Sequence, residues 1–291
     1  MAGFLKRLVP RRFRKSGVVI PVVRLHGAIM AGGSQFRPAL NLAGVAQALD
    51  RAFAYKDAPA VALSVNSPGG SPVQSRLIFR RIRDLAAETD KRVLVFVEDV
   101  AASGGYMIAL AGDEIYADPS SIVGSIGVVS GGFGFPELLR KVGVERRVYT
   151  AGENKAILDP FRPERAEDIA YLKQLQLDIH GTFIDMVKDR RAGRLVDDPD
   201  LFSGLFWTGG RGLSLGLVDG LADMRSELRR RYGGQTRLEL VSTPRSFLGR
   251  RAPGVEGVSV DMAERIGSAG AASLASLAEE KLLWARYGLS G

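Results

Sequence analysis

Apolar residues in the first third of the chain fall into two alternating patterns. Val18 to Leu25, Ala60 to Val65 and Val93 to Val97 are continuous runs of strand length and rich in β-branched residues. Between 41 and 55, and from Tyr106 to Ala111, the apolar residues are spaced as on a helix. Because strand-like and helix-like segments alternate with short links, the pattern predicts an α/β fold with a parallel sheet.

The rest of the chain continues this alternation less regularly. A helix is expected after residue 72, a short helix within 203–220 and a strand at 237–241. Further expected elements are strands at Glu114–Ala117, Gly124–Val129 and Val144–Thr150, and helices at Pro136–Val142, 163–191 and Val258–Leu289. We divide the 291 residues into a basic arm (1–16), a central domain (17–235) and a C-terminal extension of strand, loop and helix (236–291).

Two glycine-rich turns follow buried strands and precede helices. The first turn contains Gly69 and Gly70, and the second contains Ser103 and Gly104. The carboxyl ends of parallel strands meet at one edge of a sheet, so the two turns are expected to lie together. Glycine N–H groups at such turns can bind an anion or a tetrahedral oxyanion, although a tight turn that requires positive φ explains the glycines equally well.

Ser103 is the candidate nucleophile. It stands between alanines and a pair of glycines, and small neighbours leave a hydroxyl accessible. The alternative is that Ser103 only caps the following helix, because serine favours that position.

A serine hydroxyl needs a base to remove its proton. The chain has only two histidines, His26 and His180, and neither is followed by a carboxylate at a matching turn, so a Ser-His-Asp triad is disfavoured. Lysine serves when it is neutral, and burial among apolar groups lowers its pKa. Lys155, which precedes Ala-Ile-Leu, is the best-placed lysine, and Ser125 is a plausible partner to orient its amine; an exposed loop lysine is the alternative.

Five motifs together resemble the signal peptide peptidase A (protease IV) family of Ser/Lys peptidases in its short, single-repeat form. They are NSPGG at 66–70, VAASGGY at 100–106, GSIGVV at 124–129, GENKAILDPFRP at 152–163 and FWTGGRGLSLGLVD at 206–219. They occur in the family's order and span most of residues 17–225. Asp159, where the family often has a small residue, and the segment after about 235 depart from the family pattern.

The resemblance implies a ClpP/crotonase-like α/β spiral of repeated ββα units, followed here by a C-terminal helical extension. It implies Ser103 as the acyl-forming nucleophile, Lys155 as general base and then acid, and Ser125 as the residue that orients the lysine. Gly69 or Gly70, with Gly104, would form the oxyanion hole. It further implies a peptide substrate such as a cleaved signal peptide, no cofactor and no metal. A homo-oligomer is expected, in which a neighbouring protomer can supply the lysine.

Composition adds three expectations. The chain has no cysteine, which rules out disulfides and thiolate metal sites. Its net charge of +8 is concentrated in residues 6–15, which mix basic and apolar side chains. Such a segment favours peripheral contact with an anionic membrane; a disordered arm or a nucleic-acid tail is the alternative, and nucleic acid is disfavoured because no recognition module accompanies the charge.

The chain lacks an apolar run of the length that a signal peptide or a membrane span requires. We therefore expect a cytoplasmic protein with peripheral contact on the inner face of the cytoplasmic membrane. Two other functions remain open: a non-catalytic oligomeric scaffold that binds membrane proteins or peptides, and crotonase-like acyl-CoA chemistry, for which neither turn offers a carboxylate base.

Overall fold

The structure is a computed structural model that describes residues 17–32, 39–242 and 281–289. The basic arm at 1–16 and most of the helix expected at 258–289 lie outside the described residues; residues 281–285 are helical. The strands are β1 (Val19–His26), β2 (Ala60–Ser67), β3 (Arg92–Ala102), β4 (Glu114–Ala117), β5 (Ile122–Gly124), β6 (Phe206–Thr208), β7 (Gly220–Leu221) and β8 (Arg237–Leu240). The helices are α1 (Leu42–Phe53), α2 (Pro72–Thr89), α3 (Gly104–Ala109), α4 (Pro136–Val142), α5 (Ala166–Arg191), α6 (Gly209–Ser214) and α7 (Met224–Tyr232).

The strands form one mainly parallel sheet in the order β6-β5-β3-β2-β1-β8. The long strand β3 pairs with β4 through residues 94–97 and with β5 through residues 100–102, so the sheet divides into two branches along it. The branch through β4 continues to β7, and the branch through β5 ends at β6, which is antiparallel. This architecture confirms the predicted fold class. Because β8 pairs in parallel with β1, residues 237–240 of the expected C-terminal extension belong to the main sheet.

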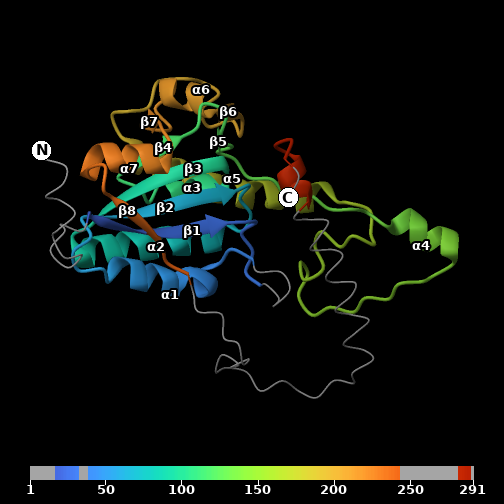
Figure 1. Ribbon diagram of the computed structural model, residues 1–291. Helices are drawn as coiled ribbons and strands as arrows, with labels where there is room; N and C mark the ends of the chain where they lie inside the picture. Colours follow the sequence, from blue (N-terminus) through green and yellow to red (C-terminus); the bar gives the residue numbers. More distant parts are fainter. Residues whose placement is uncertain (1–16, 33–38, 243–280, 290–291) are drawn as a thin grey trace, which may run out of the picture.

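Helices cover both faces of the sheet (Figure 1). On one face, α1, α2, α3 and α5 bury side chains such as Phe53, Ile82 and Tyr106 against the inward-facing valines and leucines of β1–β3. On the other face, a smaller cluster holds Leu228 of α7. Since β2 and the first half of β3 are buried on both faces, their continuous apolar runs are those of central parallel strands.

Two predicted strands are wrong. Only Ile122–Gly124 pairs as β5, because Ser125 has φ of +53° and turns the backbone out of the sheet. Val144–Thr150 forms no strand and is largely exposed, since no strand among the described residues pairs with it. The short elements α7, β6 and β7 were not predicted, and α7 has too few buried apolar residues to show helical periodicity.

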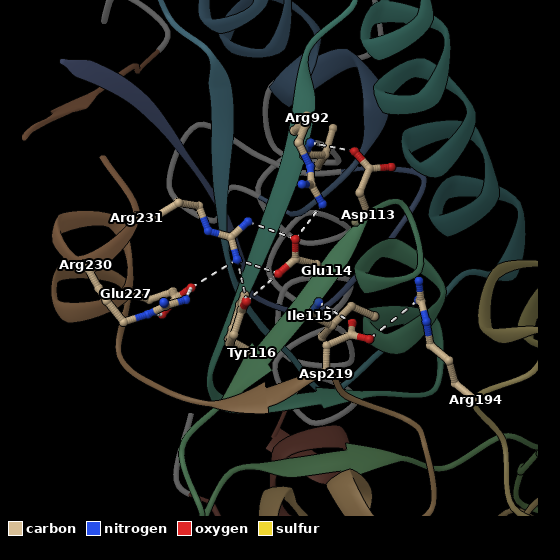
Figure 2. Close-up of polar contacts among 12 residues, drawn as sticks. Arg92, Asp113, Glu114, Ile115, Tyr116, Arg194, Asp219, Glu227, Arg230 and Arg231 are labelled. Atoms are coloured by element: carbon tan, nitrogen blue, oxygen red, sulfur yellow. Dashed lines mark hydrogen bonds and ion pairs between the residues drawn. The ribbon is translucent and has the colours of Figure 1, made fainter. Parts of the chain in front are cut away.

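Ion pairs fix α7 to the β4 branch (Figure 2). Arg231 on α7 donates to both carboxylate oxygens of Glu114 on β4 and to Glu227 one turn earlier. The Arg231 guanidinium and the Tyr116 hydroxyl hold the pKa of Glu114 down, at about 2. These charge-assisted contacts join α7 to the sheet where little apolar surface is available.

A second ion pair is almost fully buried. The Arg191 side chain at the end of α5 is 1% exposed; it donates to both carboxylate oxygens of Asp219 and to the carbonyl of Gly216. Asp219 also accepts from the N–H of Ile115 on β4. The pair therefore ties α5 to the segment between α6 and β7.

We expect Arg191→Met to lower the free energy of unfolding by about 3 kcal/mol, because it leaves the Asp219 carboxylate without its buried partner. Urea unfolding followed by circular dichroism measures the change. Arg140→Met is the matched control, since the Arg140–Glu137 pair on α4 is exposed, and it should change stability little. Equal effects of the two substitutions would contradict this role for Arg191.

We expect Glu114→Gln to reduce stability at pH 7 by roughly 1 to 2 kcal/mol, a value that allows for solvent screening of the partly exposed pair. The lowered pKa means that Glu114 stabilises the fold above its ordinary pKa of 4.5, and that this contribution disappears as the pH falls towards 2. The difference between wild type and variant should therefore shrink below pH 4.5 in urea titrations. A difference that stays constant from pH 7 to pH 3 would contradict this assignment.

Candidate active site

Ser103 lies at the sharp turn between β3 and α3. Its backbone has φ of +52° and ψ of −122°, a strained conformation for a residue with a side chain. The turn is held on both sides, since the Ser103 N–H donates to the Gly124 carbonyl at 2.8 Å and its carbonyl accepts from Met107 at 3.0 Å. Its side chain makes no capping hydrogen bond to the helix. The capping alternative is therefore disfavoured, and the half-buried Ser103 lies on a strained strand-turn-helix of the kind that can carry a nucleophile.

Glycine is required directly after Ser103. A Cβ atom on Gly104 would stand 2.4 Å from the Ser75 hydroxyl oxygen, and one on Gly105 would stand 2.3 Å from the Ser67 carbonyl oxygen. The start of α3 therefore packs against the end of β2 and the first turn of α2. This close approach brings the two glycine-rich turns together, as the sequence predicts.

The turn after β2 directs the N–H of Gly70 towards the turn after β3. Gly70 forms a parallel bridge with Ile29, in which Ile29 donates to the Gly69 carbonyl and Ser71 donates to the Ile29 carbonyl. Because such a bridge uses the groups flanking Gly70, the N–H of Gly70 itself points away from Ile29. The Gly70 nitrogen lies 3.4 Å from the position of a Cβ on Gly104, so the two glycines are direct neighbours.

Gly69 has a different place in the turn. Its N–H donates to the Ser67 hydroxyl at 3.3 Å, and a Cβ on it would stand 2.9 Å from both the Gly104 nitrogen and the Ser103 Cβ. Gly69 therefore leaves room for the Ser103 turn. Of the two glycines that the sequence offers as the second oxyanion donor, the geometry favours Gly70.

Ser125 lies at the end of the neighbouring strand. It follows Gly124, whose carbonyl accepts from Ser103, and it is 2% exposed. Its N–H donates to the Leu205 carbonyl at 2.8 Å, and its hydroxyl oxygen accepts from the Tyr287 hydroxyl at 3.1 Å. The structure thus gathers Ser103, Gly104, Gly70 and Ser125 at one edge of the sheet.

Lys155 does not join this group within one chain. It lies in a segment of residues 129–165, called the arm below, which includes α4 and extends away from the sheet (Figure 1). No residue of the arm is buried, and Lys155 is exposed. Within the part of the chain that the structure describes, its side chain makes no hydrogen bond and no ion pair. Among the described residues of a single chain, Lys155 therefore lacks the burial expected for it.

A cavity of about 610 Å³ lies between the arm and the start of α5. Its lining includes Glu153 and Ala156, which lie close to Lys155 in sequence, and the aromatic side chains of Phe133 and Phe135. Charged residues such as Arg162 and Asp168 line it as well. Ser103 does not line this cavity. A hollow with mixed apolar and charged lining therefore lies beside the segment that carries Lys155, and Ser103 is not part of it.

The two histidines make other contacts. His26 Nε2 lies 2.7 Å from the Ser64 hydroxyl, and burial lowers its pKa, an effect that nearby Glu98 partly opposes. His180 Nε2 lies 3.0 Å from the Ile126 carbonyl oxygen. Neither histidine is hydrogen-bonded to Ser103 in the described part of the chain. Among the described residues, no group of three or more His, Cys, Asp or Glu side chains could hold a metal ion, and no described helix is long and apolar enough to cross a membrane.

Comparison with known proteins identifies the family of this chain. Residues 86–231, half of the chain, match the sequence profile of peptidase family S49. The chain belongs to peptidase family S49. This confirms the resemblance to the signal peptide peptidase A family that the five motifs indicate.

The chain covers only part of the length of each of its relatives. A protein of Brucella abortus (strain 2308) named "Na(+)/H(+) antiporter NhaA" is 67% identical over 99% of this chain, but the chain covers 39% of that protein. "Serine protease SPPA, chloroplastic" of Arabidopsis thaliana is 34% identical over 57% of the chain and 24% of its own length. "Protease 4" of Haemophilus influenzae is 32% identical over 69% of the chain and 32% of its own length. The chain thus spans about two fifths or less of these relatives, and their names describe the longer proteins.

We expect Gly104→Ala to destabilise the fold by about 1 to 3 kcal/mol, because the added methyl group overlaps the Ser75 hydroxyl. Adding Ser75→Ala removes that oxygen, so the double variant should unfold at a higher urea concentration than Gly104→Ala alone. Ser75→Ala by itself is the control, since it loses only the hydrogen bond to the Ser71 carbonyl. A double variant less stable than Gly104→Ala would contradict the packing described here.

Proposed function

We propose that the protein is a serine peptidase that cleaves peptides through an acyl-enzyme. The observation that carries the proposal is the strained Ser103 turn with the neighbouring N–H groups of Gly70 and Gly104. The Ser103 oxygen attacks the peptide carbonyl while its proton passes to the neutral amine of Lys155. The two glycine N–H groups stabilise the negative charge that develops on the carbonyl oxygen.

The lysine then completes the cycle as an acid and again as a base. Its ammonium group gives the proton to the leaving amine, the peptide C–N bond breaks, and the acyl group stays on Ser103. A water molecule, deprotonated by the same lysine, attacks the ester and releases the acid product. Ser125 orients the lysine amine, which has no second nitrogen to fix its direction.

We place Lys155 in the site of a neighbouring copy of the chain. Three observations support this: the lysine is exposed, the arm contains no buried residue, and large apolar side chains such as Phe133 and Tyr149 are 78% and 88% exposed. Contact with a second copy would bury these side chains and the lysine stem together. A homo-oligomer is therefore part of the proposal.

The substrate class follows from the family and from part of the cavity beside Lys155. Phe133, Phe135, Ile157 and Leu158 in its lining can contact the apolar side chains of a peptide such as a cleaved signal peptide. The basic segment at 1–16 lies outside the described residues, and its contact with the inner face of the cytoplasmic membrane stays a prediction.

A non-catalytic scaffold that binds membrane proteins or peptides is the second candidate. The distance in the fold between the Lys155 arm and Ser103 favours it, because a single chain without a base near its serine would bind peptides and not cleave them. Activity measurements on variants decide between the two.

We expect Ser103→Ala and Lys155→Ala each to lower peptidase activity at least about a thousandfold, since each removes a group that takes part in bond making. Hydrolysis of an internally quenched apolar peptide by the purified chain measures this. Glu137→Gln, on the exposed face of α4, is the control for a change in the arm and should retain activity. Full activity of Ser103→Ala would exclude the mechanism.

Mixing the two inactive variants tests where the lysine acts. If Lys155 serves a neighbouring copy, co-refolded mixtures of equal parts regain up to about a quarter of wild-type activity, because that share of sites combines an intact serine with an intact lysine. If the lysine acts within its own chain, the mixture stays inactive. Sedimentation of the mixture checks that the copies have assembled together.

A further inference from the structure

The C-terminal segment 281–289 packs beside the candidate active site. Tyr287, Trp284 and Leu289 contact Val100 and Ala102 at the end of β3, directly before Ser103, together with Ile122 of β5. This segment lies outside the residues matched to the family, 86–231. Its contacts are therefore not explained by the family resemblance.

Tyr287 is the residue through which the segment contacts the site. Its side chain is buried at 8% exposed, and its ring meets the ring of Phe206 edge to face, with 5.1 Å between the centroids. Val100 and Ala102 pack on it as well. A ring held on several sides places its hydroxyl with little freedom.

That hydroxyl donates to the Ser125 hydroxyl oxygen at 3.1 Å. The backbone N–H of Ser125 donates to Leu205, the residue before Phe206. Leu205 thus fixes the main chain of Ser125, and Tyr287 fixes its side chain. The contact between the rings of Phe206 and Tyr287 joins these two supports. A serine at φ of +53° is held in a costly conformation by such surrounding contacts.

The contact leaves Ser125 able to bind a lysine. A serine hydroxyl has one hydrogen and two acceptor positions, and Tyr287 uses one of the acceptor positions. The remaining acceptor and the hydrogen are directed by the first bond, so the hydroxyl no longer rotates freely. A fixed hydroxyl orients an approaching amine better than a rotating one.

We infer that Tyr287 is a positioning residue, which fixes the Ser125 hydroxyl for the lysine amine and so makes the C-terminal segment part of the catalytic centre. This rests on the proposed function. The alternative, that the segment obstructs the site and lowers activity, predicts the opposite effect of removing the hydroxyl.

The test removes one oxygen atom in the full chain. Tyr287→Phe keeps the ring contacts with Phe206, and we expect kcat to fall about fivefold to tenfold with KM changed less than about twofold, since only the orientation of the lysine is lost. Tyr55→Phe is the matched control, because Tyr55 also donates its hydroxyl, at 2.6 Å to Glu239, at the opposite end of the sheet from these turns. It should leave both constants unchanged.

A double-mutant cycle shows whether Tyr287 acts through Ser125. In a Ser125→Ala background, Tyr287→Phe should have no further effect on kcat, whereas a merely structural role would reduce the rate in both backgrounds equally. Unchanged kcat in Tyr287→Phe, a rise in kcat, or additive effects in the cycle would each overturn the inference. Ser103→Ala separates this failure from failure of the proposed function: if it is inactive, the mechanism stands and only the role of Tyr287 is lost, and if it is fully active, both are lost.

Discussion

The close approach of the two glycine-rich turns at the carboxyl ends of β2 and β3 is the constraint on which the rest of the structure depends. Gly69, Gly70 and Gly104 lie so near one another and their neighbours that side chains on them would overlap backbone or side-chain atoms. The proposed oxyanion hole of Gly70 and Gly104 depends on this approach, which makes the two glycines direct neighbours. The sheet, its helices and the tight packing of α3 against β2 serve to hold these turns in register.

The candidate catalytic groups are divided between a buried part of the fold and an exposed part. The serines and the glycine N–H groups lie on strand ends that belong to a buried core, whereas Lys155 lies in an arm without one. A preorganised oxyanion site has to be rigid. The free energy needed to reorganise it during the reaction would offset the stabilisation that it gives to the oxyanion. In the proposed mechanism the lysine instead requires burial to be neutral, and a second copy of the chain would provide that burial on assembly.

Sequence patterns predicted most of the sheet because β1, β2 and β3 are continuous apolar runs, and they placed Ser103 because strand and helix flank it. They failed at Val144–Thr150, since a β-branched run becomes a strand only when a neighbouring strand pairs with it. They missed α7, whose position depends on Arg231 and Glu114, residues far apart in sequence. They also could not pair Tyr287 with Ser125, because no local pattern records a contact over 162 positions.

The division of the sheet along β3 separates stability from activity, two properties that mutation usually changes together. One branch, through β4, carries the ion pairs that secure α7, and the other, through β5 and β6, carries Ser125 and the contacts of Tyr287. Charge changes on the first branch can therefore accumulate without displacing the hydroxyl groups on the second. A lineage could adapt this protein to a new temperature or acidity on one side of a single strand, and leave its chemistry on the other side unaltered.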